Sequence, residues 1–312
     1  MEQDQLTLDM FLNMESENQK SVKNTFIDQP SRRKTFPSKI IHDFNQFMDH
    51  ISKNTILLTP KDTSIPSKSL AELNKIMSFQ KQYTSRNTQK AHYPYIHFLY
   101  LLALKSHLIE KKSLNTKENY LYVTERWSTY TQFTRAEQYF LLLETFWVDL
   151  DWEELIPDNE LHVHLMLPDI FQKLLHNDTH TLQFDEQQLM TNLISHWNEF
   201  PLFLDWLGIW SCSYHNQGIT LNTFPQSITL TGFGVKMLPI FIQSRPLEKW
   251  NLPLRRSYRE HNPRPGTKIT DSWTGEGSKE QLKNQRFEPF YKAFTALFYS
   301  KDLNQTLPRK DF

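Results

Sequence analysis

The sequence predicts a mainly helical α+β protein with two winged-helix-like units, each of which carries a short β-hairpin. Apolar residues recur at three- and four-residue spacing, and two stretches alternate like paired strands. The order helix, helix, hairpin, helix then occurs twice. We divide the chain into a flexible acidic tail (1–35), a first unit (36–155), a second unit (156–245) and a basic, linker-like arm with a short terminal helix (246–312).

The first unit opens with three predicted helices. The first has its apolar side chains on one face, which comprises Ile40, Ile41, Phe44, Phe47, Met48 and Ile51. Ser67 is a good N-cap for a second, short helix that runs to Phe79. Pro94 then begins a helix that is apolar nearly all round, which predicts that it is buried.

A β-hairpin follows these helices. Residues 108–114 and 120–124 flank the polar segment NTKEN, and the second stretch alternates as a strand does. Beyond the hairpin, Thr134 and Glu137 form a capping box that begins a helix reaching Leu150. Together these elements complete the first unit.

The second unit repeats this order with few identical residues. Residues 186–198 are predicted helical, and an aromatic segment follows at 201–207. Residues 209–212 and 228–230 flank a polar loop as a hairpin with a long arm, and a helix runs from there to Ile242. The pattern indicates a weak internal duplication of architecture. After it, the arm is rich in Pro, Gly and Arg, and the terminal helix spans 287–297.

Composition excludes several functional classes. Lys and Arg number 35, as do Asp and Glu, so the chain is formally neutral. Residues 31–117 nevertheless carry a net charge of +10 and residues 118–200 one of −12. This contrast indicates either a basic surface for phosphates or two blocks that pack together and neutralise each other. The first glycine is Gly208, which excludes a glycine-rich phosphate loop before it.

Cysteine usage and the distribution of apolar residues indicate a cytoplasmic protein with no membrane contact. Cys212 is the single cysteine, so it forms neither an intrachain disulfide nor a thiolate zinc site, and we interpret it as a small packed residue. No apolar run approaches the length of a membrane span, and the N-terminus lacks the features of a secretory signal.

One family resemblance rests on the segments LTPKDTSIPSKSLAELNKIM, YPYIHFLYLLALKSHLIE and LYVTERWSTYTQFTRAEQYFLLLETFWVDL, with LGIWSCSYHNQGITLNTFPQSITLTGFGVKML as a second unit. Over residues 56–245 the chain resembles the N-terminal winged-helix region of a bacterial and plasmid family. That family is named after the third open reading frame of a rhizobial root-inducing plasmid. The resemblance implies winged-helix folding and a mobile-element context. No segment resembles the family's β-rich namesake domain, so no function of that domain is implied.

Basic side chains in one loop, in the hairpin and in the arm are the candidates for contact with nucleic acid. They are Lys81, Arg86, Lys90, Lys111, Lys112, Lys117, Arg255, Arg256 and Arg259. We expect the first six to gather on one side and to contact duplex DNA weakly, without sequence preference. A solvated loop and hairpin, with an ordinary linker beyond them, is the alternative. A winged helix reads DNA with the helix before its hairpin, and here that helix offers few polar side chains in either unit.

A short apolar motif in the tail is a candidate for docking to a protein. Its residues are Gln5, Leu6, Leu8, Met10 and Phe11. They resemble the peptide by which bacterial replication proteins bind the sliding clamp, with a glutamine at the groove rim and apolar side chains in pockets. The alternative is that the motif folds back on the domain.

We expect no catalytic residue, metal or cofactor. His162, His164, His176 and His180 lie within 19 residues and could hold zinc, but no second shell or HExxH motif accompanies them. The sequence therefore predicts a non-enzymatic accessory protein of DNA maintenance or of a mobile element, which binds nucleic acid, protein or both. A protein–protein scaffold without nucleic-acid contact is the first alternative, and a hydrolase is the second. The oligomeric state is left open.

Overall fold

The computed structural model describes most of the two units and the beginning of the arm. The described ranges are 36–60, 63–80, 93–114, 118–155, 163–184, 200–214, 225–258 and 260–267. They form a mainly helical protein with two small antiparallel sheets, which confirms the predicted fold class. The acidic tail, the predicted helix at 186–198 and the predicted terminal helix lie outside these ranges. Among the described helices, none combines the length and the apolarity needed to cross a membrane.

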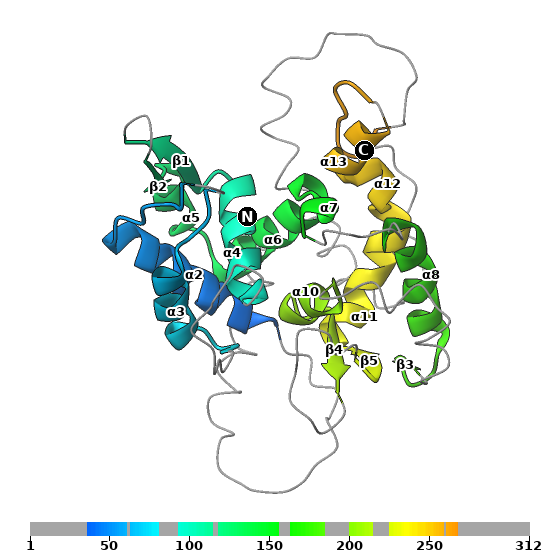
Figure 1. The fold of residues 1–312 in the computed structure, drawn as a ribbon. Helices are drawn as coiled ribbons and strands as arrows, with labels where there is room; N and C mark the ends of the chain where they lie inside the picture. The colour runs from blue at the N-terminus through cyan, green and yellow to red at the C-terminus, as the bar shows by residue number, and fades with distance from the viewer. Residues whose placement is uncertain are drawn as a thin grey trace, which may run out of the picture.

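The first unit has the element order of a winged helix (Figure 1). Its elements are α2 (Ser38–Lys53), α3 (Ser67–Ile76), α4 (Pro94–Lys105), β1 (Ile109–Ser113), β2 (Asn119–Val123), α5 (Arg126–Tyr130), α6 (Arg135–Glu144), the π-helical turn η2 (Thr145–Asp149) and α7 (Trp152–Leu155). A bridge between Leu57 and Tyr120 adds a short third strand beside β2. The predicted capping box is present, since Thr134 Oγ1 accepts from the Glu137 N–H and Glu137 accepts from the Thr134 N–H.

The second unit repeats this order in the part that the structure describes. Its elements are α8 (Val163–His176), β3 (Thr181–Gln183), α10 (Phe200–Trp206), β4 (Trp210–Ser213), β5 (Ser227–Leu230), α11 (Gly232–Pro239) and the π-helical turn η4 (Ile240–Ser244). The three strands lie in the order β3–β5–β4, with both pairs antiparallel. Strand β3, which the sequence analysis missed, stands where the Leu57 strand stands in the first unit.

The joint between helix and hairpin has the same geometry in both units. A residue with positive φ follows the helix before each hairpin, namely His107 (57°) after α4 and Gly208 (70°) after α10. A threonine after the hairpin donates its hydroxyl to the carbonyl of that residue. The distance is 2.7 Å from Thr124 to His107 and 2.6 Å from Thr231 to Gly208. The internal duplication therefore extends to individual hydrogen bonds although the residues differ.

The two units share one hydrophobic core, and the helices before their hairpins, α4 and α10, meet within it. Phe98 of α4 lies 5.0 Å from Phe203 and 5.8 Å from Trp206 of α10, measured between ring centroids. The two π-helical turns also meet, since the Trp147 and Phe241 rings stack with centroids 4.2 Å apart. The helices and turns in equivalent positions therefore form the contact between the units.

The beginning of the arm is folded, which differs from the linker-like prediction. It forms α12 (Leu247–Trp250) and α13 (Leu252–Ser257), which contact η2. The amide of Asn251 donates to the carbonyls of Trp147 and Leu150, both at 3.0 Å. This buried amide fixes the arm to the first unit, and a sequence rich in Pro and Arg gives no sign of such a contact.

We predict that Gly234→Ala destabilises the protein by about 3 kcal/mol. A Cβ at Gly234 would lie 1.7 Å from the carbonyl oxygen of Ile209, and that backbone cannot move without disturbing the joint. Urea unfolding measures the change. Glu72→Ala, on the exposed side of α3, is the control and should have little effect. A fully stable Gly234→Ala variant would contradict this packing.

Candidate interaction surface on the first hairpin

The first hairpin has a buried inner face and an outer face that is turned away from the core. Successive residues of a strand point to opposite faces of its sheet. Ile109 and Leu121 are buried on the inner face. The pairing of Glu110 with Tyr122, of Lys112 with Tyr120 and of Leu57 with Tyr120 places these five residues together on the other side. We call the surface formed by Leu57, Glu110, Lys112, Tyr120 and Tyr122 the outer face.

Large apolar side chains are exposed on the outer face and at the tip of the hairpin. Leu57 is 45% exposed, Tyr122 is 37% exposed, and Leu114 next to the turn is 63% exposed. The Lys112 ammonium lies 3.2 Å from the centroid of the Tyr122 ring, so it covers one side of that ring. Apolar side chains that are exposed together, with charges beside them, are typical of interaction surfaces.

The equivalent face of the second sheet is different in chemistry. Its residues are Thr181, Gln183, Ser211, Ser213, Ser227 and Thr229. The hydroxyls of Thr181 and Thr229 are hydrogen bonded to each other at 3.0 Å. Because the same architecture accepts small polar side chains in this position, it does not require the leucine and tyrosines of the first sheet.

The hairpin lysines do not share one side, contrary to the expectation from the sequence. Lys111 and Lys112 are neighbours in β1 and point to opposite faces of the sheet. Lys111 donates to the Thr63 hydroxyl at 3.0 Å, and its ammonium lies 5.8 Å from the Tyr100 ring centroid. The other four basic residues of this predicted surface, Lys81, Arg86, Lys90 and Lys117, lie outside the described residues.

The helices that precede the two hairpins, α4 and α10, present no exposed face to a DNA groove. No residue of α4 is exposed, and α10 is likewise without an exposed residue. Both helices face each other across the core rather than solvent. This burial agrees with the expectation that neither helix reads bases.

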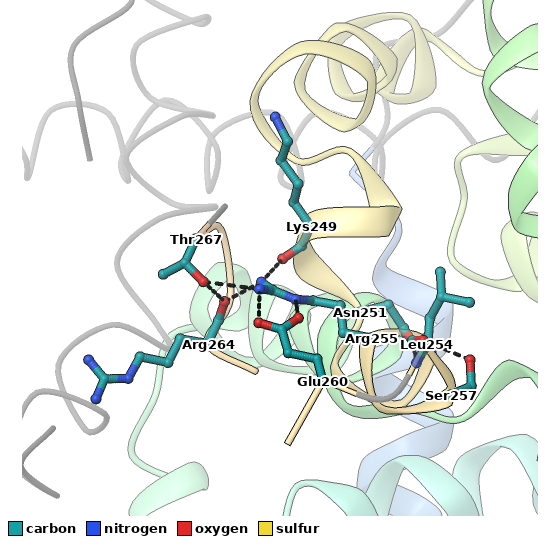
Figure 2. A network of polar contacts seen from close by, with 8 residues as sticks. All are labelled: Lys249, Asn251, Leu254, Arg255, Ser257, Glu260, Arg264 and Thr267. Carbon is teal, nitrogen blue, oxygen red and sulfur yellow. Dashed lines mark hydrogen bonds and ion pairs between the residues drawn. The ribbon is translucent and has the colours of Figure 1, made fainter. Parts of the chain in front are cut away.

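Arg255 holds the arm together and offers nothing to a phosphate (Figure 2). Its side chain is 0% exposed, and Nε and Nη2 donate to the Glu260 carboxylate at 2.5 and 2.6 Å. Nη1 donates to the carbonyls of Lys249 and Arg264, and Nη2 also donates to the Thr267 hydroxyl. All five guanidinium N–H groups are thus used within the chain, so the expectation that Arg255 contacts nucleic acid is corrected.

The other two arginines of the predicted arm surface differ from Arg255. Arg256 is exposed on α13, whereas Arg259 lies outside the described residues. The proposed nucleic-acid surface of the arm therefore reduces, among the described residues, to Arg256.

The histidines do not form a cluster in the part of the chain that is described. His164 shares a 2.8 Å hydrogen bond with the Tyr258 hydroxyl at the start of α8. His176 lies twelve residues further along this helix, about 18 Å away at 1.5 Å per residue. His162 lies outside the described residues, and the described ones contain no group of three or more His, Cys, Asp or Glu side chains placed for a metal ion.

Cys212 in β4 and Asp205 in α10 are both half-buried. Burial raises the pKa of the Cys212 thiol, whose sulfur lies 3.6 Å from the Pro201 carbonyl oxygen. A thiol that stays protonated is a poor nucleophile, which agrees with a packing role. Burial also raises the pKa of Asp205 to about 6, while the Cys212 N–H and the Lys39 ammonium act in the opposite direction.

The sequence analysis missed Leu57 as a surface residue. Leu57 lies between the buried residues Ile56 and Leu58, and three consecutive apolar residues give no signal of which side is exposed. The alternation of Tyr120 and Tyr122 indicates that both side chains point to one face of β2. The structure adds that β2 pairs with β1 on one side and with Leu57 on the other, which completes the outer face.

Comparisons with known proteins add no relative to these observations. No protein-family model, no curated protein and no solved structure matches this chain. The resemblance drawn from the sequence therefore stays a prediction.

We predict that Arg255→Ala lowers the free energy of unfolding by about 3–5 kcal/mol, because it leaves the Glu260 carboxylate and two carbonyls without their buried donor. Arg256→Ala is the matched control and should change stability by less than about 0.5 kcal/mol. Chemical unfolding of both variants measures the difference. Equal stabilities would contradict the structural role of Arg255.

We predict that Asp205 makes the protein less stable as the pH rises from about 4 to 6. The folded-state pKa is raised to about 6, so the folded protein binds the proton more tightly than the unfolded chain does. This stabilisation is full below the unfolded pKa and is lost as the pH passes the folded pKa, at a cost of about 2 kcal/mol. Asp205→Asn removes this contribution. Unfolding free energies measured across this range should diverge between variant and parent; parallel curves would contradict the prediction.

Proposed function

We propose that this protein is a non-enzymatic binding protein, in which the two winged-helix-like units form a scaffold that presents the first hairpin to a protein partner. The observation that carries the proposal is the exposure of Leu114 and Tyr122 on the first hairpin and of Leu57 in the segment bridged to it. The described residues on the same face of the second sheet are small hydroxyl residues and one glutamine. The hairpin also lies on the side of the first unit away from the second unit, where a partner could approach it (Figure 1).

Two further features favour binding through a hairpin over reading of duplex DNA. The helices that read bases in winged-helix proteins are α4 and α10 by position, and both are covered by each other and by the core. The hairpin carries the exposed acids Glu110 and Glu118 beside Lys111 and Lys112, so its described charges balance. A balanced, partly apolar surface suits a protein better than a polyanion.

Weak contact with a nucleic-acid backbone is the second candidate function. It is favoured by the exposed Lys111 on the inner side of the hairpin and by the net charge of +10 over residues 31–117. The cytoplasmic location, and the role in DNA maintenance or in a mobile element, belong to this proposal as implications of the sequence. Binding of the tail motif to a sliding clamp would fit the same role, and that motif lies outside the described residues.

We predict that tagged protein purified from its native cells retains a protein partner after nuclease treatment. Leu57→Ser with Tyr122→Ser should remove the partner, because both exposed apolar contacts are lost. Ser211→Ala with Thr181→Ala, on the face of the second sheet, is the matched control and should retain it. Quantitative mass spectrometry of the three preparations measures the outcome.

The opposite result would favour nucleic acid. A partner that nuclease releases, and that Lys111→Glu weakens while the double serine variant does not, would overturn the protein scaffold. In that case binding of duplex DNA should also fall steeply with salt, as counterion release requires.

A further inference from the structure

We propose that the outer face of the first hairpin binds the same face of a second copy of this chain. The inference rests on the proposed function, because it names the partner of the surface described above. It requires a face that is exposed, partly apolar and complementary to itself in charge.

The outer face is accessible on the described part of the molecule. Leu57, Tyr122 and the nearby Leu114 all expose more than a third of their surface. The hairpin stands apart from the second unit, so a second copy could approach without meeting α8 or α10 (Figure 1). Tyr120 lies between Leu57 and Lys112 in the register and connects the apolar residues across the sheet.

The charges on this face are self-complementary. Glu110 and Lys112 lie two residues apart on the same side of β1, with Tyr122 directly opposite Glu110. The Lys112 ammonium lies over Tyr122, and Glu110 is exposed and forms no ion pair with another described residue. In a two-fold contact, if Glu110 of one copy meets Lys112 of the other, then Lys112 of the first also meets Glu110 of the second. The symmetry thus forms two ion pairs from one carboxylate and one ammonium per chain.

The apolar residues lie beside these pairs, because the tyrosines belong to β2 and Leu57 lies on its far side, whereas both charged residues belong to β1. Two sheets that pack face to face lie about 10 Å apart, which is the depth that tyrosine and leucine side chains of two copies fill together. Leu57, Tyr120 and Tyr122 supply such side chains from two neighbouring strands. A nucleic acid would instead bring phosphates to Glu110, so a second copy fits this face better.

The second sheet shows why only one hairpin would pair in this way. Its equivalent face carries Thr181, Ser211 and Thr229 in one row, and none of its described residues is charged. These residues supply neither large apolar side chains nor ion pairs, although the strands have the same arrangement. This face therefore provides a control surface within the same protein.

Sedimentation equilibrium of the full chain at concentrations up to about 200 µM tests the proposal. The parent protein should dimerise. Glu110→Lys and Lys112→Glu should each weaken the dimer about tenfold or more, because each change places two like-charge pairs in the contact. The double reversal, Glu110→Lys with Lys112→Glu, should restore affinity to within about threefold. Ser211→Lys on the second sheet should leave it unchanged, and circular dichroism should show that every variant is folded.

Three results would overturn the proposal. They are a parent protein that stays monomeric throughout this range, a double reversal that dimerises no better than the single ones, and a Ser211→Lys variant that is as weak as they are. None of these results by itself contradicts the scaffold function. If the parent protein is monomeric, and a foreign partner that it binds is lost in the Leu57→Ser, Tyr122→Ser variant, the proposed function stands and only the second copy is excluded.

Discussion

The contact of α4 with α10 is the constraint on which the rest of the structure depends. Phe98 packs against Phe203 and Trp206 with centroids 5.0 and 5.8 Å apart, and each fully buried ring contributes about 2–3 kcal/mol. Because this contact uses the helix before the hairpin in both units, it joins the two units into one core and removes both helices from solvent. The two hairpins remain outside, and the candidate surface lies on the one whose outer face is apolar and charged.

Buried polar groups connect the elements of this core at defined places. Arg245 pairs with Glu144 at 3.3 Å, and its guanidinium lies 3.7 Å from the Trp250 ring. Asp43 accepts from the Tyr95 hydroxyl at 2.7 Å and connects α2 with α4. Such groups cost free energy to bury, so losing one partner is more damaging than losing an exposed pair. They connect segments far apart in the sequence and so fix one arrangement of the helices.

The two units share the hydrogen bond between hairpin and preceding helix, and they differ in their sheet surfaces. In both units the threonine after the hairpin donates to the carbonyl of the positive-φ residue after the helix before the hairpin. Each unit also has a π-helical turn in the contact between them. Their outer sheet faces have diverged to tyrosine, leucine and charge in one unit and to hydroxyls in the other. Features that both units keep are those the fold needs, and the feature that differs is the better candidate for function.

The sequence by itself determined the elements whose signal is local. The capping box of Thr134 and Glu137, the buried helix after Pro94 and the first hairpin follow from hydrogen bonding and periodicity within a few residues. Only the tertiary structure decided that Leu57 borders β2, that α4 faces α10 and that Arg255 is buried under residues 260–267. The physical reason is that a local pattern specifies which side of an element is apolar. Which other helix or strand packs against that side depends on side chains that are distant in the sequence.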